Sequence, residues 1–247
     1  MWGGVRFISF VVYSFGLKGV CGWCVLRVDW SDGVFRRDKI QRILRVLAAA
    51  GGELRFGKIA SETEIAGSTL NHNLNILVGR GVVSRCDGVV RLVYKTPLCF
   101  VFDSPTVRYA YLGLLGERGG REESETATAI DLLGGVGLVF DKVRVVTTFG
   151  CVSEWEGCVP GDVDWFLVGD EEIRRVNAME RRVEGVLEEL MRDYVVIMDC
   201  TSATKPATIA FYKLANEYWV PLIYIYEKTR ELAWIISREE LSRRLLG

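Results

Sequence analysis

The chain has little of several residues that carry chemistry in other classes of protein. Its 247 residues include one histidine, His72, and one glutamine, Gln41. A single histidine excludes a His-rich metal site. Neither GxGxxG nor GxxxxGK[ST] occurs, so dinucleotide-binding and P-loop folds lack their fingerprints. Scarce glutamine beside abundant Val, Arg, Glu and Leu is typical of thermophiles, and we expect an archaeal thermophile as the source.

The seven cysteines form no zinc pattern. Cys21-Gly-Trp-Cys24 is a lone CxxC with no second pair after it, and we expect neither a metal nor a cofactor. Most of the cysteines are expected to be small buried apolar residues. Cys151 and Cys158 flank a glycine-containing turn and would be able to pair in a hyperthermophile. Both possibilities stay open for that pair.

The N-terminal apolar run is too short to span a bilayer. Residues 1–15 resemble a short signal peptide, but Gly16, Lys18 and Gly19 interrupt the run and no small-residue cleavage site follows. For residues 1–29 we favour a strand or an over-extended start over a membrane anchor. We therefore expect a cytoplasmic protein with no membrane partner.

Length and charge together suggest two domains. Residues 1–96 hold 14 Lys and Arg against 7 Asp and Glu, whereas residues 97–247 hold 17 against 25. Because the basic residues prevail only in the first part, we expect only that part to meet a polyanion.

Residues 30–104 have the pattern of a winged helix-turn-helix domain. Apolar residues at helical spacing begin at Ile40, a shorter segment covers 56–66, and a third helix is expected after an N-cap at Ser68. The β-rich runs 82–86 and 89–93 then flank Asp87-Gly88. This is a hairpin signal, because both turn positions need positive φ.

The third helix would be the recognition helix of such a domain, and we expect double-stranded DNA as a partner. Asparagine is a natural partner of adenine edges, and the wing arginines would take phosphates. The alternative is that such helices only build dimers, since this one has no Lys or Arg before Arg80. The candidate DNA-binding residues are Ser68, Thr69, Asn71, His72, Asn75 and Arg85.

Residues 105–247 alternate between strand and helix patterns. This rhythm predicts an α/β, Rossmann-like, mostly parallel sheet with helices on both faces, preceded by the smaller winged helix-turn-helix domain. Strands are expected at 108–115, 142–148, 162–168, 194–198, 220–226 and 229–236, and helices at 122–133, 179–192, 206–217 and after Ser237.

A polar turn, "DCTSATKP" at 199–206, joins an apolar strand to a helix. In open α/β sheets, ligands gather outside the carboxyl ends of the strands, where this turn lies. Free amides at the helix start, the hydroxyls of the turn and Lys205 would converge there on an anion. A solvated loop that only caps the helix is the competing interpretation.

The arrangement strand–Asp199-x-Thr201-x-x-Thr204-Lys205–helix–Val220-Pro221–strand resembles the ligand-binding motif of the CRISPR-associated Rossmann fold (CARF) family. The resemblance covers roughly residues 105–230. The family usually has two glycines between the threonines, where this chain has Ser202 and Ala203. The loop "LGLLGERGGREESE" after the first strand matches the family's other ligand loop in position.

The resemblance implies a homodimer that binds cyclic oligoadenylate, with tetra-adenylate favoured, across a two-fold axis in antiviral defence. Tyr109, Tyr111 or Phe149 would pack against the bases of the ligand, unless these residues belong to the hydrophobic core. Arg118 and Arg121 would contact the edge of the ligand, unless they are ordinary surface residues. Glutamates beside these two arginines would repel phosphate. The candidate ligand-binding residues are Thr201, Ser202, Ala203, Thr204, Lys205, Gly116 and Arg118.

Two functions compete for this pair of domains. The first is a cyclic oligoadenylate-sensing, DNA-binding regulator, which the charge split and the wing favour. The second is a metal-independent ring nuclease, in which the ribose 2′-OH attacks the adjacent phosphate. In that case Lys205 would be the catalytic residue, helped by Thr204 or Ser202, since this chemistry needs positioning and charge stabilisation more than a base.

Overall fold

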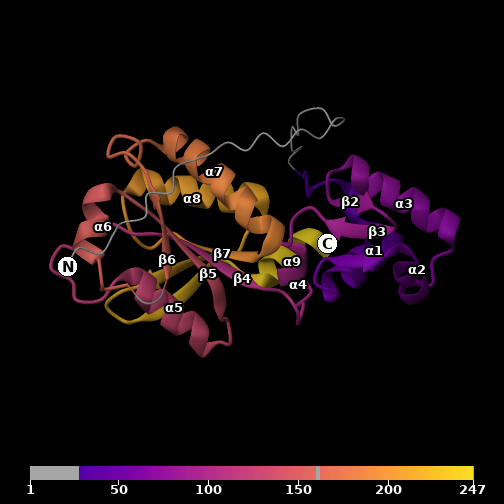
Figure 1. The fold of residues 1–247 in the computed structure, drawn as a ribbon, viewed down its shortest axis with the longest axis horizontal. Coiled ribbons are helices and arrows are strands. Elements are labelled where there is room, and N and C mark those ends of the chain that lie inside the picture. The colour runs from indigo at the N-terminus through magenta and orange to yellow at the C-terminus, as the bar shows by residue number, and fades with distance from the viewer. Residues whose placement is uncertain (1–27, 160–161, 247) are drawn as a thin grey trace, which may run out of the picture.

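The computed structural model describes residues 28–159 and 162–246. The expected N-terminal strand and the Cys21–Cys24 pair fall almost wholly on residues 1–27, outside the described residues. Within the described part, a smaller N-terminal unit lies beside a larger unit built on a sheet (Figure 1).

The N-terminal unit combines helices with a small antiparallel sheet. Strand β3 lies at the centre of that sheet, in the order β1-β3-β2. Its elements are η1 (Gly33–Arg36), α1 (Asp38–Ala49), β1 (Glu53–Arg55), α2 (Phe56–Thr63), α3 (Gly67–Gly79), β2 (Val83–Cys86) and β3 (Val89–Leu92).

The apolar spacing of the sequence explains these elements. The face of α1 that carries Ile40 and Leu47 is fully buried. The hairpin prediction is confirmed, because Asp87 and Gly88 have φ of 50° and 74° between β2 and β3. The predicted cap of α3 is wrong: the helix begins two residues earlier than a cap at Ser68 implies, and its N-cap Ala66 makes no side-chain hydrogen bond. Ser68 therefore lies inside the first turn of the helix.

The larger unit is an α/β sandwich around a six-stranded sheet, in the order β6-β5-β4-β7-β8-β9. Neighbouring strands are parallel except for β8 and β9. Its strands are β4 (Tyr109–Leu114), β5 (Phe140–Thr147), β6 (Val163–Leu167), β7 (Val195–Asp199), β8 (Leu222–Tyr226) and β9 (Glu231–Ile236). Its helices are α5 (Glu125–Gly135), α6 (Phe149–Trp155), α7 (Val176–Asp193), α8 (Lys205–Tyr218) and α9 (Arg238–Leu246).

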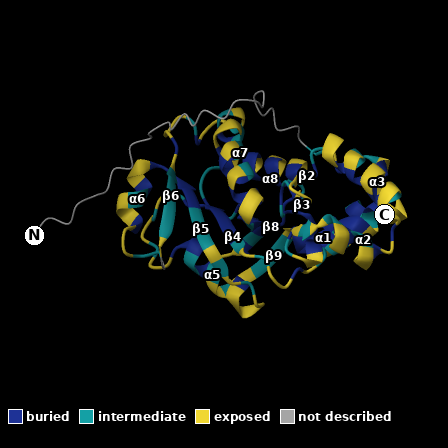
Figure 2. Ribbon diagram, turned by 45° about the vertical axis from the view of Figure 1, so that its right-hand side comes forward, coloured by how far each residue is buried: buried dark blue, intermediate teal, exposed yellow. Residues whose placement is uncertain are grey.

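Helices cover both faces of this sheet. Figure 1 shows α7 and α8 side by side on one face and α5 on the other. The central strand β7 is buried along its whole length. In Figure 2, buried residues lie between the helices, whose outer faces are exposed. A strand buried on both faces reads as a continuous apolar run, which is the pattern of residues 195–198. The predicted fold class is confirmed.

The segment after β5 differs from the sequence prediction. The sequence prediction placed a turn between Cys151 and Cys158, but residues 151–155 belong to the short helix α6, with Cys151 buried on it. Cys151 and Cys158 are both free thiols, so the proposed disulfide is absent from this structure. At the far end of the chain, the predicted cap of α9 is confirmed, because Ser237 Oγ accepts the backbone N–H of Glu240 at 3.2 Å.

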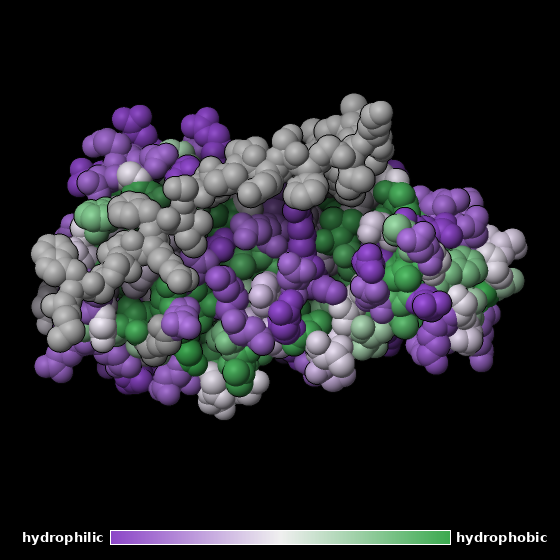
Figure 3. Space-filling view, viewed as in Figure 1, coloured by the Kyte–Doolittle hydropathy of each residue, from purple (hydrophilic) through white to green (hydrophobic). Residues whose placement is uncertain are grey.

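The two units are joined by a buried connection. Helix α4 (Leu98–Val101) is fully buried and packs against α1 and α9. The backbone N–H of Lys95 donates to the carbonyl of Met191 at 2.7 Å, and the N–H of Val196 donates to Thr96 Oγ1 at 2.9 Å. On the face in Figure 3, hydrophilic side chains gather near the centre, over α7 and α9.

Candidate functional site

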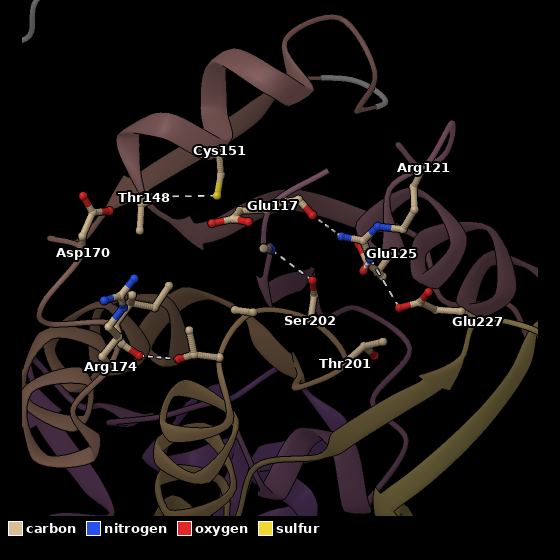
Figure 4. A pocket seen from close by; sticks show the side chains of 14 residues that line it. Glu117, Arg121, Glu125, Thr148, Cys151, Asp170, Arg174, Thr201, Ser202 and Glu227 are labelled. Atoms are coloured by element: carbon tan, nitrogen blue, oxygen red, sulfur yellow. Dashed lines mark hydrogen bonds and ion pairs between the residues drawn. The ribbon is translucent and has the colours of Figure 1, made fainter. Parts of the chain in front are cut away.

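A pocket of about 440 Å³ opens at the carboxyl ends of β4 and β7. The strand order reverses here, because β5 and β6 lie on one side of β4 whereas β7 and β8 lie on the other. Such a switch point is where open α/β sheets bind ligands. The lining residues are Gly116, Glu117, Arg121, Glu125, Thr148, Cys151, Asp170, Ile173, Arg174, Thr201, Ser202, Ala203, Thr204 and Glu227. Figure 4 shows this pocket.

The turn after β7 is shaped by Asp199, which is completely buried. Its Oδ1 accepts the backbone N–H of Thr201 at 2.8 Å and also the Thr201 hydroxyl. Its Oδ2 accepts the hydroxyl of Tyr111 at 2.5 Å. Thr201 Oγ1 in turn accepts the N–H of Ile225 at 2.8 Å, which ties the turn to β8. Asp199 therefore acts on the site through the turn and does not line the pocket.

The same burial changes the proton affinity of both groups in this pair. Burial raises the pKa of Asp199, although the hydrogen bonds from Thr201 and Tyr111 act in the opposite direction. Burial also raises the pKa of Tyr111 well above its ordinary value, and the neighbouring carboxyl adds to the shift. Tyr111 therefore stays a neutral hydrogen-bond donor in the core.

A second contact joins this turn to the loop after β4. The N–H of Gly116 donates to Ser202 Oγ at 3.0 Å, and its carbonyl accepts the indole N–H of the buried Trp155 at 2.9 Å. Any Cβ at position 116 would lie 3.1 Å from both the N and the Cα of Ala203. Gly116 therefore permits the close approach of the two loops, which a Cβ would crowd, and it has no unusual φ.

Ala203 has φ of 73°, the left-handed conformation in which glycine is favoured. Ser202 and Ala203 stand where the CARF family, which this motif resembles, usually has glycines, and an L-residue adopts positive φ less readily than glycine does. The turn nevertheless adopts it at Ala203, at a cost of about 1–2 kcal/mol for an L-residue.

Helix α8 begins at this turn with unused donors. Thr204 is its N-cap: its hydroxyl oxygen accepts the N–H of Ala207 at 3.4 Å, and its proton goes to the carbonyl of Ile173. Within the described residues, the backbone N–H groups of residues 202–205 have no hydrogen-bond acceptor. Unpaired N–H groups at the start of a helix favour an anion.

Two cations stand near these amides, and they are placed differently. Lys205 is exposed and does not line the pocket. Arg174, which the sequence analysis did not select, lines the pocket and makes no hydrogen bond or ion pair with any described residue. In Figure 4, Arg174 and Asp170 lie at one end of the pocket and Arg121, Glu125 and Glu227 at the other.

The arginines of the loop after β4 are already engaged. Arg118 donates through Nε to the carbonyl of Arg121 at 2.7 Å and through Nη1 to the carbonyl of Glu154 at 3.2 Å. Arg121 forms ion pairs with the buried Glu125 and with Glu227, the latter at 3.4 Å. Both guanidinium groups also lie over the ring of Trp155. Both arginines brace the loop, and of the two only Arg121 lines the pocket.

The pocket is consequently mixed in charge. Its lining includes four carboxylates, those of Glu117, Glu125, Asp170 and Glu227, against the two guanidinium groups of Arg121 and Arg174. The sequence prediction that glutamates would repel a phosphate therefore applies to the end of the pocket that carries Glu117 and Glu227. The end formed by Arg174 and the turn is the more favourable one for an anion.

The three aromatic residues expected to pack against a base, Tyr109, Tyr111 and Phe149, differ in burial and position. Tyr111 is fully buried and bonded to Asp199, so this expectation is wrong for it. Tyr109 lies at the opposite end of β4 from the pocket, at the strand's first residue. Phe149 is 79% exposed at the start of α6, directly after the pocket residue Thr148. Among the three, Phe149 alone remains available to a ligand.

The candidate DNA-binding residues form one surface of the N-terminal unit. Ser68, Asn71, His72 and Asn75 are exposed, at the i, i+3, i+4, i+7 spacing of one helix face, and Thr69 is half-buried. Arg85 on β2 is exposed and contacts this face, since its Nη1 donates to Oδ1 of Asn71 at 2.8 Å and of Asn75 at 3.1 Å. The sequence placed Arg85 in the wing but did not reveal this contact.

Residues 28–159 and 162–246 contain neither a metal-binding cluster nor a helix that could span a membrane. No group of three or more His, Cys, Asp or Glu side chains in this part is arranged to hold a metal ion. In the same part, no helix is both long and apolar enough to cross a bilayer.

Comparisons with known proteins give only remote likenesses. No family model matches the chain, and no curated protein matches it. Can2 from Sulfobacillus thermosulfidooxidans, in complex with cyclic tetra-adenylate, is 15% identical, with a TM-score of 0.37 over 52% of this chain and 35% of that one. VC1899 from Vibrio cholerae is 11% identical, with a TM-score of 0.40 over 53% and 34%. Enterococcus italicus Csm6, bound to cyclic hexa-2′-fluoro-hexa-dAMP, is 10% identical, with a TM-score of 0.36 over 57% and 38%.

The alignments thus span little more than a third of each of those structures.

Proposed function

We propose that this chain is a cyclic oligoadenylate-sensing, CRISPR-associated regulator that binds DNA through its N-terminal unit. The observation that carries the proposal is the pocket at the switch point of the sheet, which is lined by both the turn 201–204 and Arg174. Among the described residues, the amides of 202–205 and the guanidinium of Arg174 have no hydrogen-bond partner. Together they form a seat for a phosphate. The CARF-like motif at Asp199–Lys205 supports an adenylate as its carrier.

The acidic end of the pocket fits a nucleotide better than it fits a bare phosphate. Adenine presents an exocyclic N–H₂ and ribose presents hydroxyls, and carboxylates accept hydrogen bonds from both. Glu117 and Glu227 would therefore meet the base or the sugar, with the phosphate at the opposite end. A pocket of about 440 Å³ is of the size that holds one drug-sized ligand. A four-nucleotide ring would need the matching pocket of a second copy, which is our reason for a homodimer.

The N-terminal unit supplies the proposed DNA contact. Three helices followed by an antiparallel hairpin, with a polar face on the third helix, support a winged helix-turn-helix at residues 30–104. Among the cations of this unit, Arg36, Arg37 and Lys39 are exposed at the start of α1 and have no ion-pair partner among the described residues. Free cations of this kind would meet backbone phosphates.

The ring-nuclease alternative rests on Ser202. Its oxygen accepts the N–H of Gly116, so its own proton is free to reach a ligand, whereas the Thr204 proton is committed to Ile173. Lys205, the expected catalytic residue, lies outside the pocket lining. Charge stabilisation at the scissile phosphate would then rest on Arg174, and sensing without cleavage is the function we favour.

A binding and conversion assay tests the proposal. Wild-type protein and Arg174→Ala are titrated with cyclic tetra-adenylate by calorimetry, and the ligand is then analysed by chromatography. Loss of one charge-assisted contact should cost about 1.5–3 kcal/mol, or roughly 10- to 150-fold in affinity. Arg175→Ala is the matched control, because Arg175 pairs with Glu171 at 3.7 Å and does not line the pocket.

Equal affinity of Arg174→Ala and wild type for cyclic tetra-adenylate would contradict the proposal that Arg174 binds a phosphate of the ligand. No binding by the wild type would end the sensor proposal, and linear products would replace it with the nuclease. DNA binding is measured separately by gel retardation at several salt concentrations. Retardation that is independent of salt would argue against a phosphate-contacting surface.

A further inference from the structure

One arginine controls how the polar face of α3 is presented. Arg85 projects from β2 across that face, and its Nη1 donates to Oδ1 of Asn71 at 2.8 Å and to Oδ1 of Asn75 at 3.1 Å. Its guanidinium carbon also lies 5.6 Å from the ring centre of Phe56, at the start of α2. The arginine is thus held between the wing and two helices.

The sequence spacing makes this arrangement possible. Asn71 and Asn75 are four residues apart, so their side chains are neighbours on the surface of α3. Arginine carries only donors, so from an amide side chain it can take only the carbonyl oxygen. The ring of Phe56 favours a guanidinium over its face, which further restricts the Arg85 side chain.

This contact determines which atoms the asparagines offer to a base. Asparagine reads adenine with both ends of its amide, accepting from N6 and donating to N7. In this structure the carbonyl oxygens of Asn71 and Asn75 are directed to Arg85, which takes one of the two lone pairs of each oxygen, whereas the N–H₂ groups donate to no described residue on this surface and are left for an incoming base. Two donors match the acceptor edges of guanine, N7 and O6, and of thymine, O4.

We infer that Arg85 is a specificity-determining residue that changes the α3 surface from an adenine reader to a reader of guanine and thymine acceptor edges. This inference rests on the proposed DNA-binding function. It also replaces the expectation, made from the sequence, that the asparagines pair with adenine and that Arg85 only contacts phosphate.

The test is selection from a random DNA library with full-length protein, followed by affinity measurements on matched duplexes. Wild type should enrich guanine or thymine at the positions that α3 contacts. Arg85→Met keeps much of the apolar stem but removes the donors, so the asparagines become free to pair with adenine. We expect the ratio of guanine-site to adenine-site affinity to fall by roughly tenfold or more, the discrimination of one good bidentate pair.

Arg91→Met is the matched control. Arg91 lies on the adjacent strand β3, is 53% exposed and pairs with Glu53 at 2.7 Å, away from the asparagines. Both variants lose one positive charge, so both should weaken binding to all sequences alike, and only Arg85→Met should change the base preference. Without DNA, the side-chain amide NMR signals of Asn71 and Asn75 should move in Arg85→Met and stay in place in Arg91→Met.

Three outcomes overturn the inference, and they are distinguishable. DNA binding by Arg85→Met with an unchanged base preference overturns it and leaves the regulator intact. A guanine preference that survives the double variant Asn71→Ala and Asn75→Ala shows that Arg85 reads the base itself. Failure of the wild type to bind any DNA sinks both this inference and the proposed function.

Discussion

Replacing Gly116 by alanine should separate the two loops that form the pocket. The new Cβ would lie 3.1 Å from the N and the Cα of Ala203 and 3.4 Å from Ser202 Oγ. Because two of these three atoms belong to the backbone, no side-chain rotation relieves the contact, and the turn itself must shift. Overpacking of this kind costs about 1–3 kcal/mol. In a protein of this size that lowers the melting temperature by about 2–4 °C for each kcal/mol.

Gly185→Ala is the matched control, since it makes the same chemical change in an open position. Gly185 is exposed in the middle of α7, and a Cβ there would meet nothing within 4 Å. Alanine should therefore stabilise the helix by about 0.5–1 kcal/mol. Thermal and urea unfolding of the three proteins would reveal the opposite signs. If Gly116→Ala is as stable as wild type and binds cyclic tetra-adenylate equally well, the close approach of the two loops is not needed for the site.

Two further predictions concern the turn after β7. Ala203→Gly should raise the free energy of unfolding by a few tenths to about 1 kcal/mol in urea titrations, because glycine accepts the φ of 73° without strain; a loss of stability would contradict this account. Burial raises the pKa of Asp199 above 3.8, so the folded state binds this carboxyl proton more tightly than the unfolded chain does. The contribution of the bound proton to the free energy of unfolding is therefore present at low pH. This contribution should fall as the pH rises through the folded pKa of Asp199, by at most about 1.4 kcal/mol per pH unit. Asp199→Asn should lack this fall, so parallel pH profiles of the variant and the wild type would refute the assignment.

The longer elements could be predicted from the sequence because each carries its own periodic signal. The apolar residues of α7 and the continuous apolar run of β7 are examples, and both elements lie within a few residues of their predicted bounds. The short elements β1, α4 and α6 carry no such signal. Strand β1 has three residues and forms because Leu54 pairs with Val90 of β3. Its conformation is set by a partner distant in the sequence, which periodicity does not report.

The candidate site was predictable in its turn and not in its surroundings. Residues 199–204 can be recognised in the sequence because they are a mostly polar turn between a strand and a helix. Arg174 lies in the loop before α7. The Thr204 hydroxyl holds this loop by donating to the carbonyl of Ile173. No local sequence pattern indicates this contact. Lys205 follows Thr204 directly, but Thr204 is the N-cap with an extended backbone whereas Lys205 is the first helical residue. The lysine is exposed and does not line the pocket that its neighbour lines.

Helix α8 connects the proposed ligand seat to the N-terminal unit. Its 14 residues span about 21 Å, from the cap at Thr204 to the C-cap at Trp219. The ring of Trp219 lies 6.4 Å from that of Trp30, which in turn lies 5.2 Å from Phe35 in η1. If ligand binding displaced the Thr204 end, rigid-body movement of this packed helix would carry the displacement to the contact between the two tryptophans. The ligand can change DNA affinity only by its difference in affinity for the two positions of this helix, and DNA must change ligand affinity by the same factor.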